Sequence, residues 1–482
     1  MLSLEDYTAL GAAEIARLVR AGSLSPVDVV DAALSIQQRL DTSLHAFCTP
    51  TPEAARDAAQ ALDKRIRRGD EVGALAGVPV AIKDLVSTKG VRTTYGSKLY
   101  EDFIPDDDDI VVERLEAADA IVLGKTNASE FGYGGFGHNS LFPTTRNPWN
   151  PSLTTGGSSA GSAAAVASRI CPIAVASDGG GSIRLPAAFC GLVGIKASMG
   201  RVPVWPGCRD ARFPGASGWE SIEHIGPLAR SVVDAALMLD VIAGPDARDR
   251  LSIPDEGVGW IQAASRPQRT LGLKIAYCPD WGGVRVDRRV RALVDRAVAR
   301  FETDLDCIVT VEKAPFGDFI NCFRAIVALE TDIVGMKALS AGREGELSPS
   351  VRALLAKSWA SESFTDAITA RKRAAQSMAQ FMTSFDLILT PTVPVPPFAI
   401  DMAGPGAIEA EVVADDAWTP ALYPANLTGQ PAASVPAGWT DDGLPVGLQI
   451  IGRHLADRTV VAAAAAFEAC QPWIQRRPTI SG

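Results

Sequence analysis

Residues 174–194 read AVASDGGGSIRLPAAFCGLVG, and this stretch is the most informative one in the 482-residue chain. A short apolar run ends at Ser177 and Asp178, and three consecutive glycines then lead to Ser182. The apolar run predicts a buried strand that opens into a tight turn. Without side chains in the way, the backbone N–H groups of the glycines can converge on one point, which is the arrangement that stabilises an oxyanion. Ser182 then stands where a nucleophile would attack, although a plain turn or a phosphate-binding loop has the same pattern.

Short apolar runs of the same kind recur between turns rich in Gly and Pro, and they predict further buried strands. These predicted strands cover residues 78–82, 120–123, 173–176, 387–390, 433–436 and 446–451. Helical patterns alternate with the strands and cover residues 52–68, 113–118, 160–169, 231–243, 287–303 and 460–470. Near the N-terminus, Ser25 and Pro26 form the start signal of another helix. This alternation predicts an α/β fold built on a layered sheet.

The composition narrows the classes of ligand and the expected location. The chain carries 46 Lys and Arg against 56 Asp and Glu, a net charge of -10, which disfavours nucleic acid as a direct ligand. No apolar run reaches the ~20 residues of a membrane helix, and the first residues lack signal-peptide features. We therefore expect a soluble, cytoplasmic protein. The eight cysteines and four histidines are scattered without ligand spacing, so we expect no metal site.

Two further stretches contain residue types that catalysis uses. Residues 155–162, TGGSSAGS, precede an alanine-rich helix whose N-terminus a serine can cap, but capping explains only one of the three serines. Residues 77–84, GVPVAIKD, place Lys83 at the end of an apolar strand. Burial lowers the pKa of a lysine, and a neutral amine can act as a base. An ion pair with Asp84 is the alternative role for this lysine.

Three blocks of the chain, GVPVAIKD, GGSSAGSAAAVA and SDGGGSIRLPAAFCGLVGIK, resemble the signature blocks of the amidase signature family and occur in the same order. The separation of Ser158 from Ser182, 24 positions, also matches the family. Further segments also resemble sequences of the family: GKTNASEF, TRNPWNP, IGPLARSVVDAALML, NLTGQPAASVPAG and GLPVGLQIIG. The resemblance implies a large mixed β-sheet covered on both faces by α-helices. It also implies a single domain of residues 1–482 with a variable insertion at about 245–380.

The resemblance implies roles for individual residues as well. Ser182 matches the nucleophile, Ser158 the serine that follows a cis peptide bond, and Lys83 the buried base. The backbone N–H groups matched to the oxyanion hole are those of Gly179, Gly180, Gly181 and Ser182. The matched supporting residues are Ser159, Asp178 and Arg184. Many family members carry Thr or Ile where this chain has Gly179, so we expect a looser or wider loop here. No metal or cofactor is implied.

The implied activity is cleavage of the C–N bond of a small amide through an acyl-enzyme on Ser182. Aromatic residues in segments that line the acyl pocket of family members favour an aryl or alkyl amide. These residues are Tyr133, Phe136, Trp205 and Trp219, with Trp418 and Tyr423 in a second variable region. Core packing is the alternative role for Trp205, Phe213 and Trp219.

Other substrates and assemblies stay open at this point. Carbamates, esters and glutamine are alternative substrates for the same chemistry. The chain also fits the amidase-like subunit of a glutamine-dependent amidotransferase, which would need a synthetase partner. The resemblance is compatible with a homodimer, and it implies neither a nucleic-acid nor a membrane partner.

Two motif matches point to other chemistries and are disfavoured. Residues 132–137 fit G-x-G-x-x-G, but no strand ends directly before them and no acidic residue follows at the spacing that dinucleotide binding requires. Residues 157–161 fit G-x-S-x-G, which would make Ser159 the nucleophile of an α/β-hydrolase. That class needs a later histidine, and neither His224 nor His454 lies in the sequence context of a triad histidine.

Overall fold

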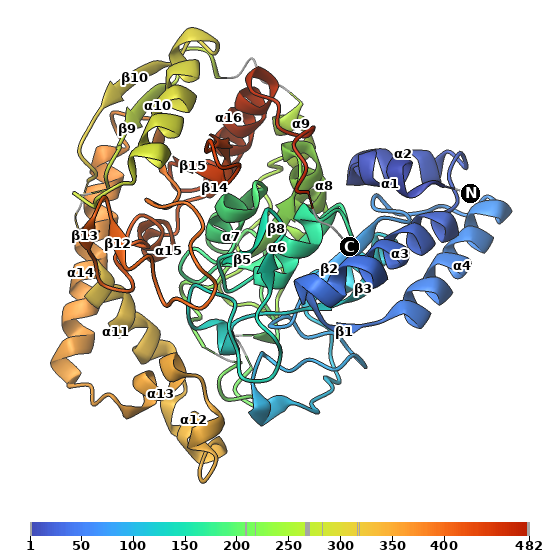
Figure 1. Ribbon diagram of the computed structural model, residues 1–482, viewed down its shortest axis with the longest axis horizontal. Coiled ribbons are helices and arrows are strands. Elements are labelled where there is room, and N and C mark those ends of the chain that lie inside the picture. Colours follow the sequence, from blue (N-terminus) through green and yellow to red (C-terminus); the bar gives the residue numbers. More distant parts are fainter. Residues whose placement is uncertain are drawn as a thin grey trace.

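The computed structural model describes residues 2–207, 210–216, 218–265, 270–281, 283–315, 317 and 319–479 (Figure 1). Its helices are α1 (Leu4–Ala9), α2 (Ala12–Arg20), α3 (Pro26–Leu44), α4 (Pro52–Arg68), α5 (Ile110–Ala117), α6 (Ala160–Ala167), α7 (Arg184–Cys190), α8 (Val232–Ile242), α9 (Trp260–Ala264), α10 (Arg288–Thr303), α11 (Ile320–Glu330), α12 (Ile333–Leu339), α13 (Pro349–Ala356), α14 (Ser361–Phe381), α15 (Tyr423–Thr428) and α16 (Asp457–Cys470). Its strands are β1 (Phe47–Pro50), β2 (Pro79–Lys83), β3 (Ile121–Thr126), β4 (Arg146–Asn147), β5 (Asn150–Thr154), β6 (Ile173–Ser177), β7 (Val193–Lys196), β8 (Ile225–Ala229), β9 (Lys274–Tyr277), β10 (Ile308–Val311), β11 (Leu387–Pro391), β12 (Ala407–Ile408), β13 (Glu411–Val412), β14 (Ala432–Trp439) and β15 (Pro445–Gly452). All the strands and helices predicted from the sequence are confirmed in type, with small shifts at their ends.

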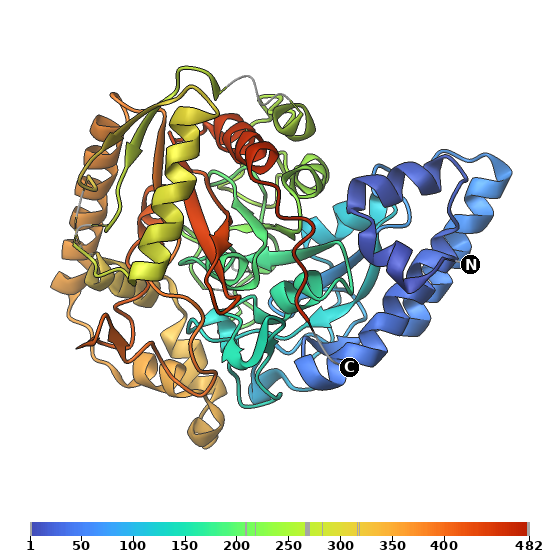
Figure 2. The ribbon, with the colours of Figure 1, turned by 45° about the horizontal axis from the view of Figure 1, so that its top comes forward.

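The centre of the molecule is one mixed β-sheet with the strand order β1-β3-β2-β6-β8-β7-β14-β15-β11-β9-β10. Strand β2 runs parallel to β3 and β6, and β9 runs parallel to β10 and β11. The strands between these groups pair antiparallel, from β6 through β8, β7 and β14 to β15. Helices α1 to α4 lie together on one side of the molecule, and α11 to α14 lie on the opposite side (Figures 1 and 2). The expected large mixed sheet is confirmed.

Helices cover both faces of this sheet. Gly447 and Gly452 are five positions apart on β15 and therefore point to opposite faces. A Cβ at Gly447 would lie 2.6 Å from Ala188 of α7, and a Cβ at Gly452 would lie 2.6 Å from Val460 of α16. The largest apolar core lies between the sheet and these layers. None of the helices in the described ranges is both long enough and apolar enough to span a membrane.

The stretch 245–380 contributes both to the sheet and to a separate group of helices. Its first part supplies β9, α10 and β10, and α10 packs against β11, β14 and β15. Its second part supplies α11 to α14, in which α11 and α14 pack against each other. Both α11 and α14 also contact α15, which lies close to the glycine-rich turn described below. The sequence patterns had assigned only α10 in this stretch.

The pairing of β2 with β6 places two of the sequence blocks side by side. Ile82 pairs with Val175 in parallel register, so the strand ends at Lys83 and Ser177 reach the same edge of the sheet. Helix α6 begins at Ala160, directly after the serine-rich segment, and it contacts both strands. Three segments that are distant in sequence therefore meet at the carboxyl ends of β2 and β6.

Candidate active site

Lys83 is fully buried at the end of β2 and contacts two serine hydroxyls. Its Nζ lies 2.7 Å from Ser158 Oγ and 2.9 Å from Ser177 Oγ. The alternative pairing of Lys83 with Asp84 is wrong, because Asp84 accepts hydrogen bonds from the backbone N–H and the hydroxyl of Thr94. The lysine thus joins the serine-rich segment to the end of β6.

The protonation of Lys83 follows from its surroundings. Burial lowers the pKa of Lys83 to about 8, because the ammonium form loses its hydration. The negative charges of Glu223 and Asp178 act in the opposite direction and raise this pKa. Near neutral pH a fraction of the molecules therefore carries a neutral amine, which can accept a proton from a hydroxyl.

Ser158 lies in a tightly packed turn before α6. The peptide bond from Gly157 to Ser158 is cis, as the family resemblance implied. A Cβ at Gly157 would lie 2.5 Å from the backbone nitrogen of Gly137, so only glycine fits between these two backbone segments. The neighbouring Ser159 donates its hydroxyl to the carbonyl of Ser177 at 3.2 Å. Ser159 therefore fastens this turn to the end of β6.

Ser182 lies in the loop that connects β6 to α7, which we call the glycine loop (residues 179–182). Its side chain is partly exposed, unlike that of Ser158. The carboxylate of Asp178 fixes the loop through two hydrogen bonds. It accepts one from the backbone N–H of Gly181 at 2.7 Å and one from that of Ile183 at 3.2 Å. These two contacts flank Ser182 and set the course of the backbone on both sides of it. They also engage the Gly181 N–H, which the resemblance had matched to the oxyanion hole.

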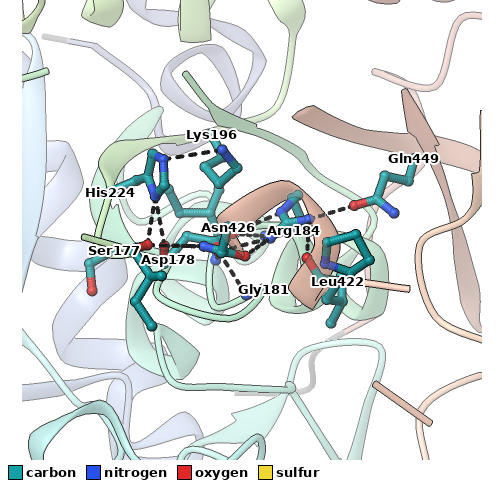
Figure 3. Close-up of polar contacts among 12 residues, drawn as sticks. Ser177, Asp178, Gly181, Arg184, Lys196, His224, Leu422, Asn426 and Gln449 are labelled. Carbon is teal, nitrogen blue, oxygen red and sulfur yellow. Dashed lines mark hydrogen bonds and ion pairs between the residues drawn. The ribbon is translucent and has the colours of Figure 1, made fainter. Parts of the chain in front are cut away.

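A buried ion pair anchors Asp178 in turn (Figure 3). Arg184 donates from Nε to Oδ2 and from Nη2 to Oδ1 of Asp178, both at 2.9 Å, and both side chains are fully buried. Although burial alone would raise the pKa of Asp178, the charge and hydrogen bonds of Arg184 hold this pKa far below its usual value. The carboxylate therefore stays ionised and continues to accept the hydrogen bonds from the glycine loop.

Two polar residues near the end of the chain complete this network, and the sequence patterns had not singled them out. Arg184 donates to Asn426 Oδ1 and Gln449 Oε1, both at 2.6 Å (Figure 3). Asn426 also donates to the backbone carbonyl and to a carboxylate oxygen of Asp178. The available signal was weak: Gln449 is a lone polar residue in an apolar strand, and Asn426 opens the family-like segment NLTGQPAASVPAG.

His224 lies behind the glycine loop and does not contact a serine nucleophile. Burial and the neighbouring Lys196 hold the pKa of His224 well below its usual range, so its ring is neutral. Its Nδ1 lies 2.8 Å from the carbonyl of Ile222 and its Nε2 lies 3.2 Å from Lys196 Nζ (Figure 3). Since Ser159 is bonded to Ser177 instead, the geometry does not support the α/β-hydrolase interpretation.

Three bulky side chains pack against the three glycines of the loop. At Gly179, an added Cβ would lie 2.6 Å from the Trp219 ring. At Gly180 it would lie 2.5 Å from the Phe323 ring, and at Gly181 it would lie 2.5 Å from the Leu422 side chain. The expected extra room at Gly179 is therefore occupied by the Trp219 ring. Phe323 belongs to α11, in a part of the chain without any recognised motif, and its ring stacks on Tyr423 with centroids 4.1 Å apart.

The predicted pocket residues separate into three places. Tyr133 and Trp219 lie together, with ring centroids 4.7 Å apart and a hydrogen bond of 3.1 Å from Trp219 Nε1 to the Tyr133 hydroxyl. Phe136 packs near Trp418 in a second aromatic cluster. Trp205 lies under the guanidinium of Arg248, 4.9 Å from its ring centroid, and does not join either group. Residues 208, 209 and 217 of the same predicted segment lie outside the described residues.

A cavity opens beside the glycine loop and the end of β6. The centre of a water molecule can occupy about 40 Å³ of it, and its lining includes Tyr95, Asp109, Ser177, Trp219, Glu223 and Ile225. Within the described ranges, no group of three or more His, Cys, Asp or Glu residues is arranged to hold a metal ion.

The chain is similar to known proteins along almost its whole length. The Amidase family model matches residues 28–461. The acylamidase of Rhodococcus erythropolis is 34% identical, and the alignment covers 98% of each chain. One subunit of the glutamyl-tRNA(Gln) amidotransferase of Thermosynechococcus vestitus is 36% identical over 95% of this chain and 97% of that protein. The crystal structure of a bacterial aryl acylamidase, described as a member of the amidase signature enzymes, superposes with a TM-score of 0.88 and 32% identity over 97% of each chain.

Proposed function

Because this chain belongs to the amidase signature family and is an amide-hydrolysing enzyme, we propose that it is a stand-alone hydrolase of small aryl or alkyl amides that forms an acyl-enzyme on Ser182. The observation that carries the proposal is the 2.7 Å contact between the buried Lys83 Nζ and Ser158 Oγ. A lysine with this burial and a pKa lowered to about 8 is suited to act as a base rather than as a surface charge.

In the proposed mechanism, neutral Lys83 accepts the proton of Ser158 while Ser158 accepts the proton of Ser182. The freed Ser182 oxygen attacks the carbonyl carbon of the amide. Ser158 then returns a proton to the departing amine, and the acyl group stays on Ser182. Water attacks this ester by the reverse relay and releases the carboxylic acid. No step needs a metal or a cofactor.

The oxyanion of the tetrahedral intermediate is proposed to rest on backbone N–H groups of the glycine loop. The N–H of Gly181 already donates to Asp178, which leaves those of Gly179, Gly180 and Ser182 for this purpose. The buried pair of Asp178 and Arg184 supports the hole by fixing the loop before the substrate arrives. Preorganised donors stabilise developing charge better than donors that must first reorient.

The aromatic side chains around the glycine loop support an aryl group in the substrate. Trp219, Tyr133 and Phe323 lie within one apolar cluster next to the loop, and such walls bind flat apolar groups. The similarity to a bacterial aryl acylamidase supports the same substrate class. A second candidate function, the amidase component of a glutamine-dependent amidotransferase, rests on the similarity to the glutamyl-tRNA(Gln) amidotransferase chain.

Product release by purified wild type and Ser182→Ala tests the proposal. We would measure aniline, amine, alcohol or ammonia release from anilides, aliphatic primary amides, carbamates, esters and glutamine. Turnover of anilides by wild type, with a loss of about 10⁴-fold or more in Ser182→Ala, is the expected result. Ser35→Ala is the matched control, because the exposed Ser35 of α3 donates its hydroxyl to the carbonyl of Asp31 within its own helix. Full activity of Ser182→Ala would refute the assignment, and turnover of glutamine alone would favour the amidotransferase function.

A further inference from the structure

The cavity beside the glycine loop carries two carboxyl groups and no basic side chain. We call it the carboxyl pocket and define it by Tyr95, Asp109, Ser177, Trp219, Glu223 and Ile225. Among the residues that the structure places in its lining, none is Lys or Arg. Burial raises the pKa of Asp109 to about 8, so this carboxyl group is mostly protonated at neutral pH. A cation bound beside it favours the ionised form, so the pocket can become negative when a positively charged group enters.

Asp109 lines this pocket and has one unsatisfied carboxyl oxygen. Asp109 is fully buried, and its Oδ1 accepts the backbone N–H of Val111 at the start of α5. Its Oδ2 has no hydrogen-bond partner among the described residues. A Cβ at Gly207, another lining residue, would lie 3.6 Å from this oxygen. A buried carboxyl oxygen with unused acceptor capacity is what a bound donor would complete.

Glu223 links the pocket to the proposed site of reaction. Its Oε2 lies 2.8 Å from the position that a Cβ would take at Gly179, the first residue of the glycine loop. Ser177, which also lines the pocket, contacts Lys83 Nζ at 2.9 Å. If the carbonyl of a substrate binds at the glycine loop, Glu223 therefore lies close to it. A substituent a few bonds from the carbonyl carbon could then reach Glu223.

We propose that the carboxyl pocket binds a protonated primary amino group of the substrate, so that the preferred substrates are amides whose acyl part carries such a group a few bonds from the carbonyl. This inference rests on the proposed function and specifies its substrate class. An ammonium donates three hydrogen bonds, and the pocket offers oxygen acceptors on Asp109, Glu223 and Ser177.

A cation in the pocket also affects the base. It lies near Ser177 and thus near Lys83, and two neighbouring positive charges disfavour each other. Binding of the amino group therefore shifts Lys83 towards its neutral form, the form that accepts a proton. The pocket would in this way couple recognition of the substrate to activation of the base.

Matched pairs of substrates test the proposal. Glycyl, β-alanyl and 4-aminobutyryl 4-nitroanilides are isosteric with the neutral propionyl, butyryl and pentanoyl 4-nitroanilides. We expect kcat/KM at pH 7 to be higher for the cationic member of at least one pair by about tenfold or more. The ratio within the pair is expected to fall by a similar factor in Glu223→Gln. Because both members of a pair use the same base, the ratio removes the part of the effect on Lys83 that does not depend on the charge of the substrate.

Two further variants make the result decisive. Glu220 lies three positions before Glu223, is partly exposed and pairs with Arg250. Glu220→Gln is expected to leave the ratio as in wild type. Asp109→Asn retains an acceptor for the cap of α5 and is expected to lower the ratio. A wild-type ratio of one or below in all three pairs, or a preference that survives in Glu223→Gln, would overturn the inference while leaving the proposed function intact.

The inference is also testable without turnover. Butylamine and butanol would be titrated into Ser182→Ala, with and without Glu223→Gln, and binding would be followed by thermal shift. Stabilisation by butylamine alone that is lost in Glu223→Gln supports the pocket even if the anilides are not hydrolysed and the proposed function fails. Equal effects of both compounds, or no effect of either, show no preference for the charged amine and refute the inference.

Discussion

The pH dependence of kcat/KM tests the buried lysine directly, and Glu223→Gln changes it in a direction that the structure defines. Burial lowers the pKa of Lys83 to about 8, while the charge of Glu223, followed by that of Asp178, raises it. If neutral Lys83 is the base, kcat/KM on a neutral anilide rises with pH and levels off above this pKa. Replacing Glu223 by a neutral side chain removes stabilisation of the ammonium form. The inflection is therefore expected to move to lower pH.

The size of the effect follows from the pKa. With a value of about 8, about one Lys83 in ten is neutral at pH 7 and about one in a hundred at pH 6. The kcat/KM of wild type is thus expected to fall about tenfold between these two pH values and to reach half of its plateau near pH 8. If the inflection lies one unit lower in Glu223→Gln, kcat/KM at pH 7 rises from about a tenth to about half of that variant's plateau.

The assay is the initial rate of butyryl 4-nitroanilide hydrolysis from pH 5.5 to 10 at constant ionic strength, with circular dichroism to establish that the protein is folded at each pH. Glu220→Gln serves as the control, since it removes a carboxylate at the surface. A profile of wild type without an inflection below pH 9.5 would refute the role of Lys83 as the base. An inflection that stays in place in Glu223→Gln would refute the electrostatic effect of Glu223 on it.

Four further predictions concern the packing around the site and one helix cap. Arg184→Met leaves the Asp178 carboxylate buried without its cation and is expected to lower the free energy of unfolding by about 3–5 kcal/mol, measured by urea denaturation; an unchanged midpoint would contradict the anchoring role. Gly180→Ala places a methyl group 2.5 Å from the Phe323 ring and is expected to lower kcat/KM on anilides by about tenfold or more. Adding Phe323→Ala should restore most of this loss, because the opposing ring is gone; steady-state kinetics of the single and double variants would detect a failure of the rescue. Phe323→Ala alone is expected to raise the ratio of kcat/KM for benzoyl over acetyl anilide, and an unchanged ratio would remove Phe323 from the substrate pocket. Ser25→Ala removes the hydroxyl that caps α3 and is expected to lower the free energy of unfolding by about 1 kcal/mol in the same urea assay.

Much of the fold and several site positions were predictable from local patterns. The run before Ser177 is β6, and Ser25 caps α3 with Pro26 in the first turn, as their sequence signals predicted. The cis bond before Ser158, expected from the family resemblance alone, is present. Residues 320–381 had no assigned elements, although they form four helices whose contacts reach the glycine loop. In α14 the buried residues are only Ala367, Ala374 and Met378, and alanine differs little from its polar neighbours in hydropathy, so the periodic signal is weak there.

The sequence by itself determined which chemical groups this protein has available: a lysine at the end of an apolar strand, a serine-rich turn before a helix and a glycine run before Ser182. These are local features, because each depends on residues that follow one another in the chain. Only the tertiary structure decided that Lys83 contacts Ser158 and not Asp84, since that choice depends on the parallel pairing of β2 with β6. It likewise decided that Phe323 packs on Gly180 and that Glu223 lies beside Gly179. Contacts between residues far apart in the chain arise from the packing of whole elements, and no local pattern encodes them.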